Sequence, residues 1–159
     1  MGITKLIYAL LITIAPITEL RAGLPLAISW AIENSVPIIP VFILVVLLNV
    51  LVIFFIFFFL DKIHRVLLKF KTYENLFGIW LEKFRKKVDK FEKRYNEIGF
   101  WALVLFVAVP LPGTGAWSGC LVSWLLGLDR KKSIFAIALG VFIAGLIILL
   151  GALGIIYLL

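Results

Sequence analysis

Two long stretches without a charged residue constrain this chain more than any other feature. Val36–Leu60 has 25 residues and Ser133–Leu159 has 27, and neither contains Asp, Glu, Lys or Arg. A helix of about 20 apolar residues crosses the hydrocarbon core of a bilayer, which is about 30 Å thick. The whole chain is 64% hydrophobic, with a mean hydropathy of +1.15, whereas soluble domains are about half apolar. We therefore predict an all-α integral membrane protein that crosses the plasma membrane more than once.

The composition leaves little material for catalysis. The 159 residues include one cysteine, Cys120, and one histidine, His64. A single cysteine excludes an internal disulfide framework and a multi-cysteine metal site. His64 lies among basic residues and has no second histidine, which disfavours a histidine-based metal site or triad. We expect no catalytic residue, no metal and no cofactor, and therefore no enzyme.

The distribution of basic residues predicts the orientation. Of 16 Lys and Arg, 11 lie in residues 61–99 with six acids, which gives 11 − 6 = +5, and three more lie at 130–132. Short basic loops stay in the cytoplasm, so both regions should be cytoplasmic. The 29 residues between them, Phe100–Leu128, must then leave and return on one face, although two crossings need about 40 residues. This predicts a re-entrant helical hairpin. Four ordinary crossings are the alternative, and they would place Lys131 and Lys132 outside.

Prolines and glycines mark where the chain could turn back. In the second half they cluster in VPLPGTGAWSG, residues 109–119, with an apolar arm of nine or ten residues on each side. Such an arm is roughly 15 Å long as a helix, which is half of the hydrocarbon core. In the first half, PITELRAGLP interrupts the apolar stretch Leu6–Ile32. The expected breaks are Pro16, Gly23 and Pro25 in the first hairpin and Pro110, Pro112 and Gly119 in the second.

The two halves repeat one plan, a broken hairpin followed by an unbroken helix. An offset of 94 pairs Pro16 with Pro110, Ala22 with Ala116, Ser29 with Ser123 and Trp30 with Trp124. If the first long helix ends in the cytoplasm, the hairpins have opposite orientations, as in the inverted repeats of secondary transporters. We predict one membrane domain made of residues 1–60, 61–99 and 100–159, with both termini outside. A signal peptide over the first 15 residues is the alternative for the start of the chain.

The central segment, residues 61–99, is the most polar. Between Phe70 and Tyr95 an aromatic or aliphatic residue recurs every three or four positions, which predicts an amphipathic helix. It could lie on anionic lipid headgroups or pair as a coiled coil in a homodimer. The small residues Ala136, Gly140 and Ala144 would likewise let the last helix approach a hairpin or a second copy. The aromatic residues do not alternate with basic ones on one exposed face, so we expect no nucleic-acid binding.

Glu19 and Arg21 are the charged residues expected inside the membrane. A charge at the bilayer centre costs about 2.5 to 3.5 kcal/mol, which suggests a function. Arg21 could bind an anionic headgroup through its planar guanidinium group, while Glu19 takes up and releases a proton. Alternatively, backbone groups of the opposite turn hold both side chains and only fasten the hairpins together. Asn49, in the first long helix, should bond to a hairpin backbone, because an unpaired buried amide is costly.

The second turn offers polar groups that suit an anion. Exposed amides near Gly113–Gly115, with nearby hydroxyls, could form a nest at the start of a half-helix. Alternatively, the small residues only let the hairpin tips pack closely. Trp117 could gate a cavity or stack on a ligand, or it could pack. The predicted substrate- or proton-binding residues are Glu19, Arg21, Gly113, Thr114, Gly115, Trp117 and Ser118.

The sequences ELRAGLPLAI and PLPGTGAWSG resemble the small multidrug export protein family. More distantly, two hairpins that are each followed by a long helix resemble the DedA superfamily, which includes the VTT-domain lipid scramblases. That resemblance implies movement of polyprenyl-phosphate carriers or phospholipids, coupled to protons through membrane acids and arginines. The second hairpin departs from the DedA pattern, because it carries neither an acid nor an arginine.

We therefore expect a transporter that moves an anionic lipid carrier, such as a polyprenyl phosphate, or a small anionic solute. Its partners would be membrane lipids and protons, with Arg21 binding charge and Glu19 coupling protons. One alternative is proton-driven export of small drugs, with Glu19 binding cationic compounds directly. Another is a non-transporting scaffold whose basic central helix recruits partners.

Overall fold

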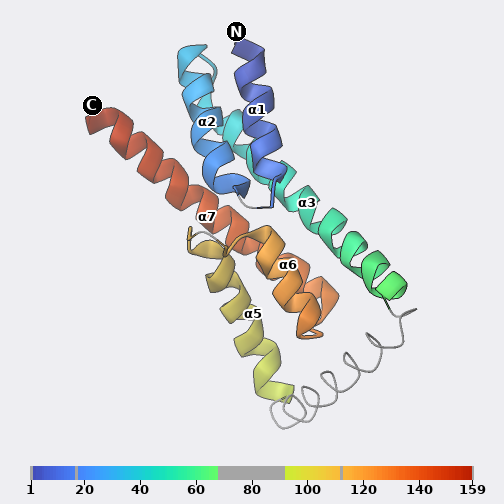
Figure 1. Ribbon diagram of the computed structural model, residues 1–159. Helices are drawn as coiled ribbons and strands as arrows, with labels where there is room; N and C mark the ends of the chain where they lie inside the picture. Colours follow the sequence, from blue (N-terminus) through green and yellow to red (C-terminus); the bar gives the residue numbers. More distant parts are fainter. Residues whose placement is uncertain (1, 17, 68–91, 112, 159) are drawn as a thin grey trace.

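The computed structural model describes residues 2–16, 18–67, 92–111 and 113–158, and all secondary structure within them is helical. The helices are α1 (Gly2–Ile14), α2 (Glu19–Glu33), α3 (Ile38–Leu67), α5 (Glu92–Ala108), α6 (Ala116–Leu125) and α7 (Arg130–Leu158) (Figure 1). The all-helical prediction is confirmed. Most of the predicted central amphipathic helix lies outside the described residues.

Two helical hairpins and two long helices make up the fold. Residues 15–18 join α1 to α2, residues 109–115 join α5 to α6, and the long helices α3 and α7 follow the hairpins. The hairpins open toward opposite ends of the molecule, and their turns meet near its middle (Figure 1). The first residues of α1 and the last residues of α7 lie toward the same end. The depth of the hairpins in a bilayer and the inverted repeat stay predictions.

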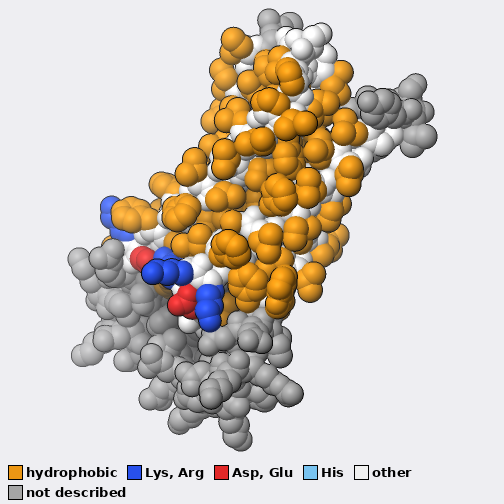
Figure 2. Space-filling view, turned by 180° about the vertical axis from the view of Figure 1, so that it is seen from behind, with side chains coloured by type: hydrophobic (Ala, Val, Ile, Leu, Met, Phe, Trp, Pro, Cys, Tyr) orange, Lys and Arg blue, Asp and Glu red, His pale blue; other side chains and the backbone are white. Residues whose placement is uncertain are grey.

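Many large hydrophobic side chains are exposed on the described residues, and two helices are suited to crossing a membrane. Within α3 and α7, Ile38–Ile63 and Arg130–Gly154 are long and apolar enough to do so. Hydrophobic side chains cover most of the face in Figure 2, and the visible charges gather at one end. Leu105 is 63% exposed and Phe135 is 67% exposed. A soluble monomer rarely exposes such a continuous apolar surface, so this surface is suited to lipid.

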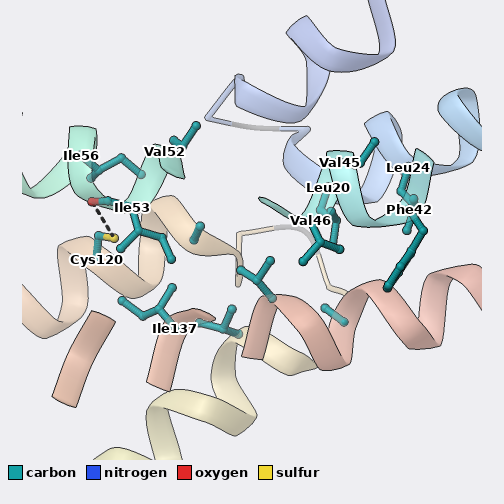
Figure 3. Close-up of a cluster of buried hydrophobic side chains, with 14 of the residues drawn as sticks. Leu20, Leu24, Phe42, Val45, Val46, Val52, Ile53, Ile56, Cys120 and Ile137 are labelled. Carbon is teal, nitrogen blue, oxygen red and sulfur yellow. Dashed lines mark hydrogen bonds between the residues drawn. The ribbon is translucent and has the colours of Figure 1, made fainter. Parts of the chain in front are cut away.

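The core connects both hairpins to the long helices (Figure 3). One group of side chains packs α2 against α3 and includes Leu24 and Val45, each with no exposed surface. A second group packs α3 against α6 and α7 and includes Ile53, Cys120 and Ile137. Because α3 contributes to both groups, it fixes the position of one hairpin relative to the other.

Three of the predicted breaks lie inside helices and are therefore wrong as breaks: Gly23 and Pro25 are within α2, and Gly119 is within α6. The glycines serve close packing instead. A Cβ on Gly23 would overlap the Thr13 hydroxyl, and a Cβ on Gly119 would lie 2.8 Å from a methyl of Val107. Membrane helices tolerate an internal proline where neighbouring groups take up the freed carbonyl.

Two of the other predicted breaks, Pro16 and Pro110, lie where the chain changes direction. Pro16 is in the first connection and Pro110 is in the second, while Pro112 lies outside the described residues. Proline removes a backbone donor and disfavours a helical conformation in the residue before it. These two prolines therefore limit α1 and α5 at the hairpin tips.

The small-residue stripe of α7 faces the second hairpin. A Cβ on Gly140 would lie 2.7 Å from the Val107 Cβ and 2.9 Å from the Val104 carbonyl oxygen. Ala136 and Ala144 are buried as well. Of the two partners that the sequence left open for this stripe, the structure shows the hairpin.

Polar contacts fasten the open end of the first hairpin. The Lys5 ammonium donates hydrogen bonds to the Ser29 hydroxyl and to the Glu33 carboxylate, and so joins α1 to α2. The hydrogen bond from Lys5 is the main reason that the pKa of Glu33 lies below its usual value. The pair is exposed, so its contribution to stability is small.

A second polar cluster lies where α3 ends and α7 begins. The Asp61 carboxylate accepts hydrogen bonds from the Trp124 indole, at 3.0 Å, and from the Arg130 guanidinium, at 2.8 Å. The Arg130 guanidinium also lies 4.4 Å from the centre of the Phe57 ring. The cluster thus joins α3, the last turn of α6 and the first turn of α7.

We predict that Gly23→Ala separates α1 from α2. The new Cβ would meet the Thr13 hydroxyl and lie 2.8 Å from the Ala9 carbonyl oxygen, so the free energy of unfolding should fall by about 1–2 kcal/mol. Unfolding of the purified protein in mixed micelles measures the change. Gly151→Ala is the control, because nothing lies within 4 Å of its Cβ. Equal stability of the two variants would contradict the packing role of Gly23.

Candidate functional site

Glu19 extends from the first hairpin into the second. One carboxylate oxygen accepts the backbone N–H of Ala116 and the other accepts that of Trp117, both at 3.0 Å. Glu19 is only 5% exposed. Because α6 begins at Ala116, these N–H groups belong to its first turn and have no acceptor within the helix. A carboxylate there also meets the positive end of the helix dipole, so Glu19 caps α6 from another part of the chain.

Gly115 makes this cap possible. It precedes α6 and has no side chain to cap the helix itself. A Cβ at this position would overlap the Glu19 carboxylate. Any residue can adopt the Gly115 φ angle of −93°. Glycine is therefore required here for the close approach of Glu19 and not for the backbone conformation.

Arg21 also contacts the second turn. Its guanidinium donates to the Thr114 hydroxyl at 2.6 Å and, more weakly, lies 3.5 Å from the Val109 carbonyl oxygen. The Thr114 hydroxyl lies within hydrogen-bond distance of the carbonyl oxygens of Val109, at 2.7 Å, and Leu111, at 2.9 Å. No ion pair joins Glu19 to Arg21 by a contact within 4 Å in the described part of the chain. Both side chains bind the opposing hairpin instead.

The remaining predicted residues divide into two groups. The Trp117 indole N–H donates to the Ile14 carbonyl oxygen at 3.0 Å, and so ties α6 to the end of α1. The Ser118 hydroxyl bonds to the Gly115 carbonyl oxygen of its own helix. Gly113 has a φ of +86° and open space around it. The structure thus brings Glu19, Arg21, Thr114, Gly115 and Trp117 together at the junction of the two tips, whereas neither Ser118 nor Gly113 makes a hydrogen bond to the described residues of the first hairpin.

A small cavity lies beside this junction. Its volume is about 10 Å³, and Glu19, Arg21, Asn49 and Gly115 are among the residues that line it. That volume is close to the room needed by one water molecule. The described conformation is therefore closed, and a substrate could enter the junction only if the tips separate.

Asn49 is a polar residue of this cavity that is not among the predicted site residues. Its side-chain amide donates to the Thr13 carbonyl oxygen at 3.0 Å, which confirms the predicted bond to a hairpin backbone. It is 1% exposed, and its Oδ1 has no hydrogen-bond partner among the described residues. The sequence signal was a lone amide in the middle of an apolar helix, but only the fold places it beside Glu19.

The described residues contain no group of three or more His, Cys, Asp or Glu side chains that could hold a metal ion. The polar groups at the junction are instead one carboxylate, one guanidinium, one hydroxyl, one amide and two backbone N–H groups. This set can exchange protons and bind anions by hydrogen bonding.

Comparisons with known proteins point to one family. No curated protein and no solved structure matches the chain. A family model with the description "Putative small multi-drug export protein" matches residues 19–147. The match begins at Glu19, the first residue of α2, and includes α3, the tip of the second hairpin and most of α7. Because it covers well over half of the sequence, the chain belongs to the family of this description.

Proposed function

We propose that this protein is a membrane transporter that exports an anionic amphipathic substrate, such as a polyprenyl phosphate, and that the junction of the hairpin tips is its gate. The observation that carries the proposal is the buried Glu19 carboxylate on the first turn of α6. A small anionic solute would use the same groups. Both substrates require the hairpin tips to separate, because the cavity at their junction has room for no more than one water molecule.

The chemistry of the junction favours an anion over a cation. The backbone amides of Ala116 and Trp117 point at a negative group, the Glu19 carboxylate. The Arg21 guanidinium of α2 binds the Thr114 hydroxyl in the connection just before them. Helix N-termini combined with arginine are suited to phosphate and carboxylate. Glu19 occupies this position in the closed conformation, so an anionic substrate would replace it. A cation would instead have to compete with two N–H groups for the carboxylate.

Proton uptake by Glu19 would open the gate. A neutral carboxyl loses its attraction to the helix dipole and gains an O–H that needs an acceptor. Asn49 lines the same cavity, and its Oδ1 has no partner among the described residues. We assign Asn49 as the positioning residue that receives this O–H, so that the carboxyl turns toward α3 and releases α6.

The dimensions of the fold support a re-entrant arrangement in the membrane. The ten residues of α6 extend roughly 15 Å, half of the hydrocarbon core. The tips meet between hairpins that open toward opposite ends, as expected for an inverted repeat whose site lies near the bilayer midplane. In this arrangement both termini are outside and residues 61–99 are cytoplasmic.

The family description favours a second candidate, the export of drugs, for which we propose cationic compounds as substrates. Here Glu19 would bind the cation after leaving α6, and Arg21 would only hold the tips together. Reconstituted liposomes containing a labelled polyprenyl phosphate, a labelled phospholipid or a cationic dye separate the two functions.

Arg21→Ala is expected to abolish movement of the polyprenyl phosphate, because the guanidinium is the permanent positive charge at the junction. Arg21→Lys should retain part of the activity, since it keeps the charge and loses the planar fork. Flux of the labelled compounds across the liposome membrane measures both. The second candidate would be favoured if Arg21→Ala liposomes still export the cationic dye but move neither labelled anion. Absence of all three fluxes in folded protein would favour a non-transporting scaffold.

A further inference from the structure

The two hairpins differ in how closely their arms pack. In the first, Gly23 brings α1 and α2 into close contact. In the second, a groove of about 290 Å³ separates part of α5 from α6. Its walls are apolar and include Ala102, Leu103 and Phe106 of α5, Val122 of α6, and Leu126 and Leu128 beyond α6. This volume is at the lower limit of small-molecule pockets, and its lining suits a hydrocarbon chain.

The groove has a polar mouth at the start of α7. A second cavity of about 10 Å³ adjoins it, since Gly99, Leu103 and Leu128 line both. This volume has room for about one water molecule. Asp129, Lys132 and Ser133 contribute its polar side. Ser133 is 3% exposed, and its hydroxyl has no partner among the described residues. A buried hydroxyl without a partner usually marks a missing ligand or water.

The charge around this mouth is positive. Residues 129–132 contain three bases and one acid, and Asp61, the partner of Arg130, is a second acid here, which gives 3 − 2 = +1. The Asp129 carboxylate accepts the Lys132 backbone N–H at 2.8 Å and so caps the start of α7. Arg130 is paired with Asp61. The Lys132 ammonium and the Ser133 hydroxyl therefore remain to bind an anionic headgroup whose chain lies in the apolar groove.

We propose that the groove between α5 and α6 is a binding site for one acyl chain of an acidic phospholipid, whose phosphate is bound by Lys132 directly and by Ser133 through one water molecule in the adjoining cavity. An acidic phospholipid is the expected occupant for two reasons. The apolar groove opens beside net positive charge, and the protein has a surface that is suited to lipid. This inference does not rest on the proposed transport function, because the groove can hold a lipid whether or not the hairpin tips open.

Photocrosslinking tests the site on the full-length protein. The probe is phosphatidylglycerol with a diazirine on one acyl chain, at low abundance in phosphatidylcholine vesicles, and a matched phosphatidylcholine probe is the reference. The readout is labelling of peptides 99–106 and 121–128 divided by labelling of the exposed α3 residues Ile43, Leu44, Leu47 and Leu51. This ratio cancels general attraction of acidic lipid to the surface. We expect the ratio to be several-fold higher for phosphatidylglycerol than for phosphatidylcholine.

Two pairs of variants locate the binding groups. Lys132→Gln should lower the ratio about fivefold, because one basic residue near anionic lipid contributes about 1 kcal/mol, and Lys131→Gln should leave it unchanged. Ser133→Ala should lower it roughly threefold. Ala102→Trp fills the groove and should remove the preference, whereas Leu105→Trp, on the same helix but outside the groove, should retain it.

Equal ratios for the two lipids, or equal effects of Lys131→Gln and Lys132→Gln, would overturn the site. Those lysine variants change surface side chains, so the comparison does not depend on whether Ala102→Trp folds. Labelling that persists in protein without transport would refute the proposed function and retain the lipid site.

Discussion

Replacing Glu19 with alanine is expected to abolish pH-driven transport and to lower the free energy of unfolding by about 2–3 kcal/mol. The change leaves the N–H groups of Ala116 and Trp117 without an acceptor in apolar surroundings. Hydrogen bonds to charged groups, and buried donors that lose them, have energies of this size. Substrate accumulation in liposomes with an imposed pH gradient, and unfolding in mixed micelles, measure the two effects.

Glu19→Gln is the matched variant, because it keeps the size and one carbonyl acceptor but carries no charge. We expect it to retain downhill movement of substrate that no longer depends on pH, and to lose only about 1 kcal/mol of stability. Accumulation against a gradient in either variant would show that Glu19 does not couple protons.

Gly115→Ala is expected to separate the two hairpin tips without altering any charged residue. Its Cβ would occupy the position of the Glu19 carboxylate, so either the carboxylate leaves α6 or the turn shifts. We expect a loss of about 2–3 kcal/mol from overpacking together with the lost cap. Transport should become slow and poorly coupled, because the closed conformation can no longer form.

Cys120 reports this separation directly. It is the only cysteine of the chain, and it is fully buried in α6. A membrane-permeant maleimide should react with Cys120 roughly tenfold faster or more in Gly115→Ala, since each 1.4 kcal/mol in an opening equilibrium is a factor of ten. Gly151→Ala, in open space on α7, is the control. An unchanged rate in Gly115→Ala would contradict the close contact at the tips.

The sequence predicted the helical class and the two long apolar helices because both depend on local features, namely length and the absence of charge. It also singled out Glu19 and Arg21 correctly as unusual, since charge in an apolar region is rare. Their partners were beyond prediction. The sequence left open whether the pair binds substrate or the opposing turn, and the described conformation shows contact with the turn.

The roles of the glycines were the least predictable part of the fold. The residue type does not distinguish Gly23, Gly115 and Gly119, since all three are glycines, yet only Gly115 lies at a break between helices. Whether a glycine bends the backbone or admits a neighbouring atom depends on contacts from residues far along the chain, here Thr13 for Gly23 and Glu19 for Gly115. The same limit applies to Asn49, whose location beside the cavity depends on how α3 packs against both hairpins.

The polar contacts of α6 limit how this helix can move. Glu19 of α2 holds its first turn, and Asp61 of α3 holds Trp124 in its last turn. Both carboxylates come from the first half of the chain. If the Glu19 hydrogen bonds to α6 break while the Asp61 hydrogen bond to Trp124 persists, α6 must rotate about its Trp124 end. The largest displacement then occurs at Ala116, where the two hairpins meet.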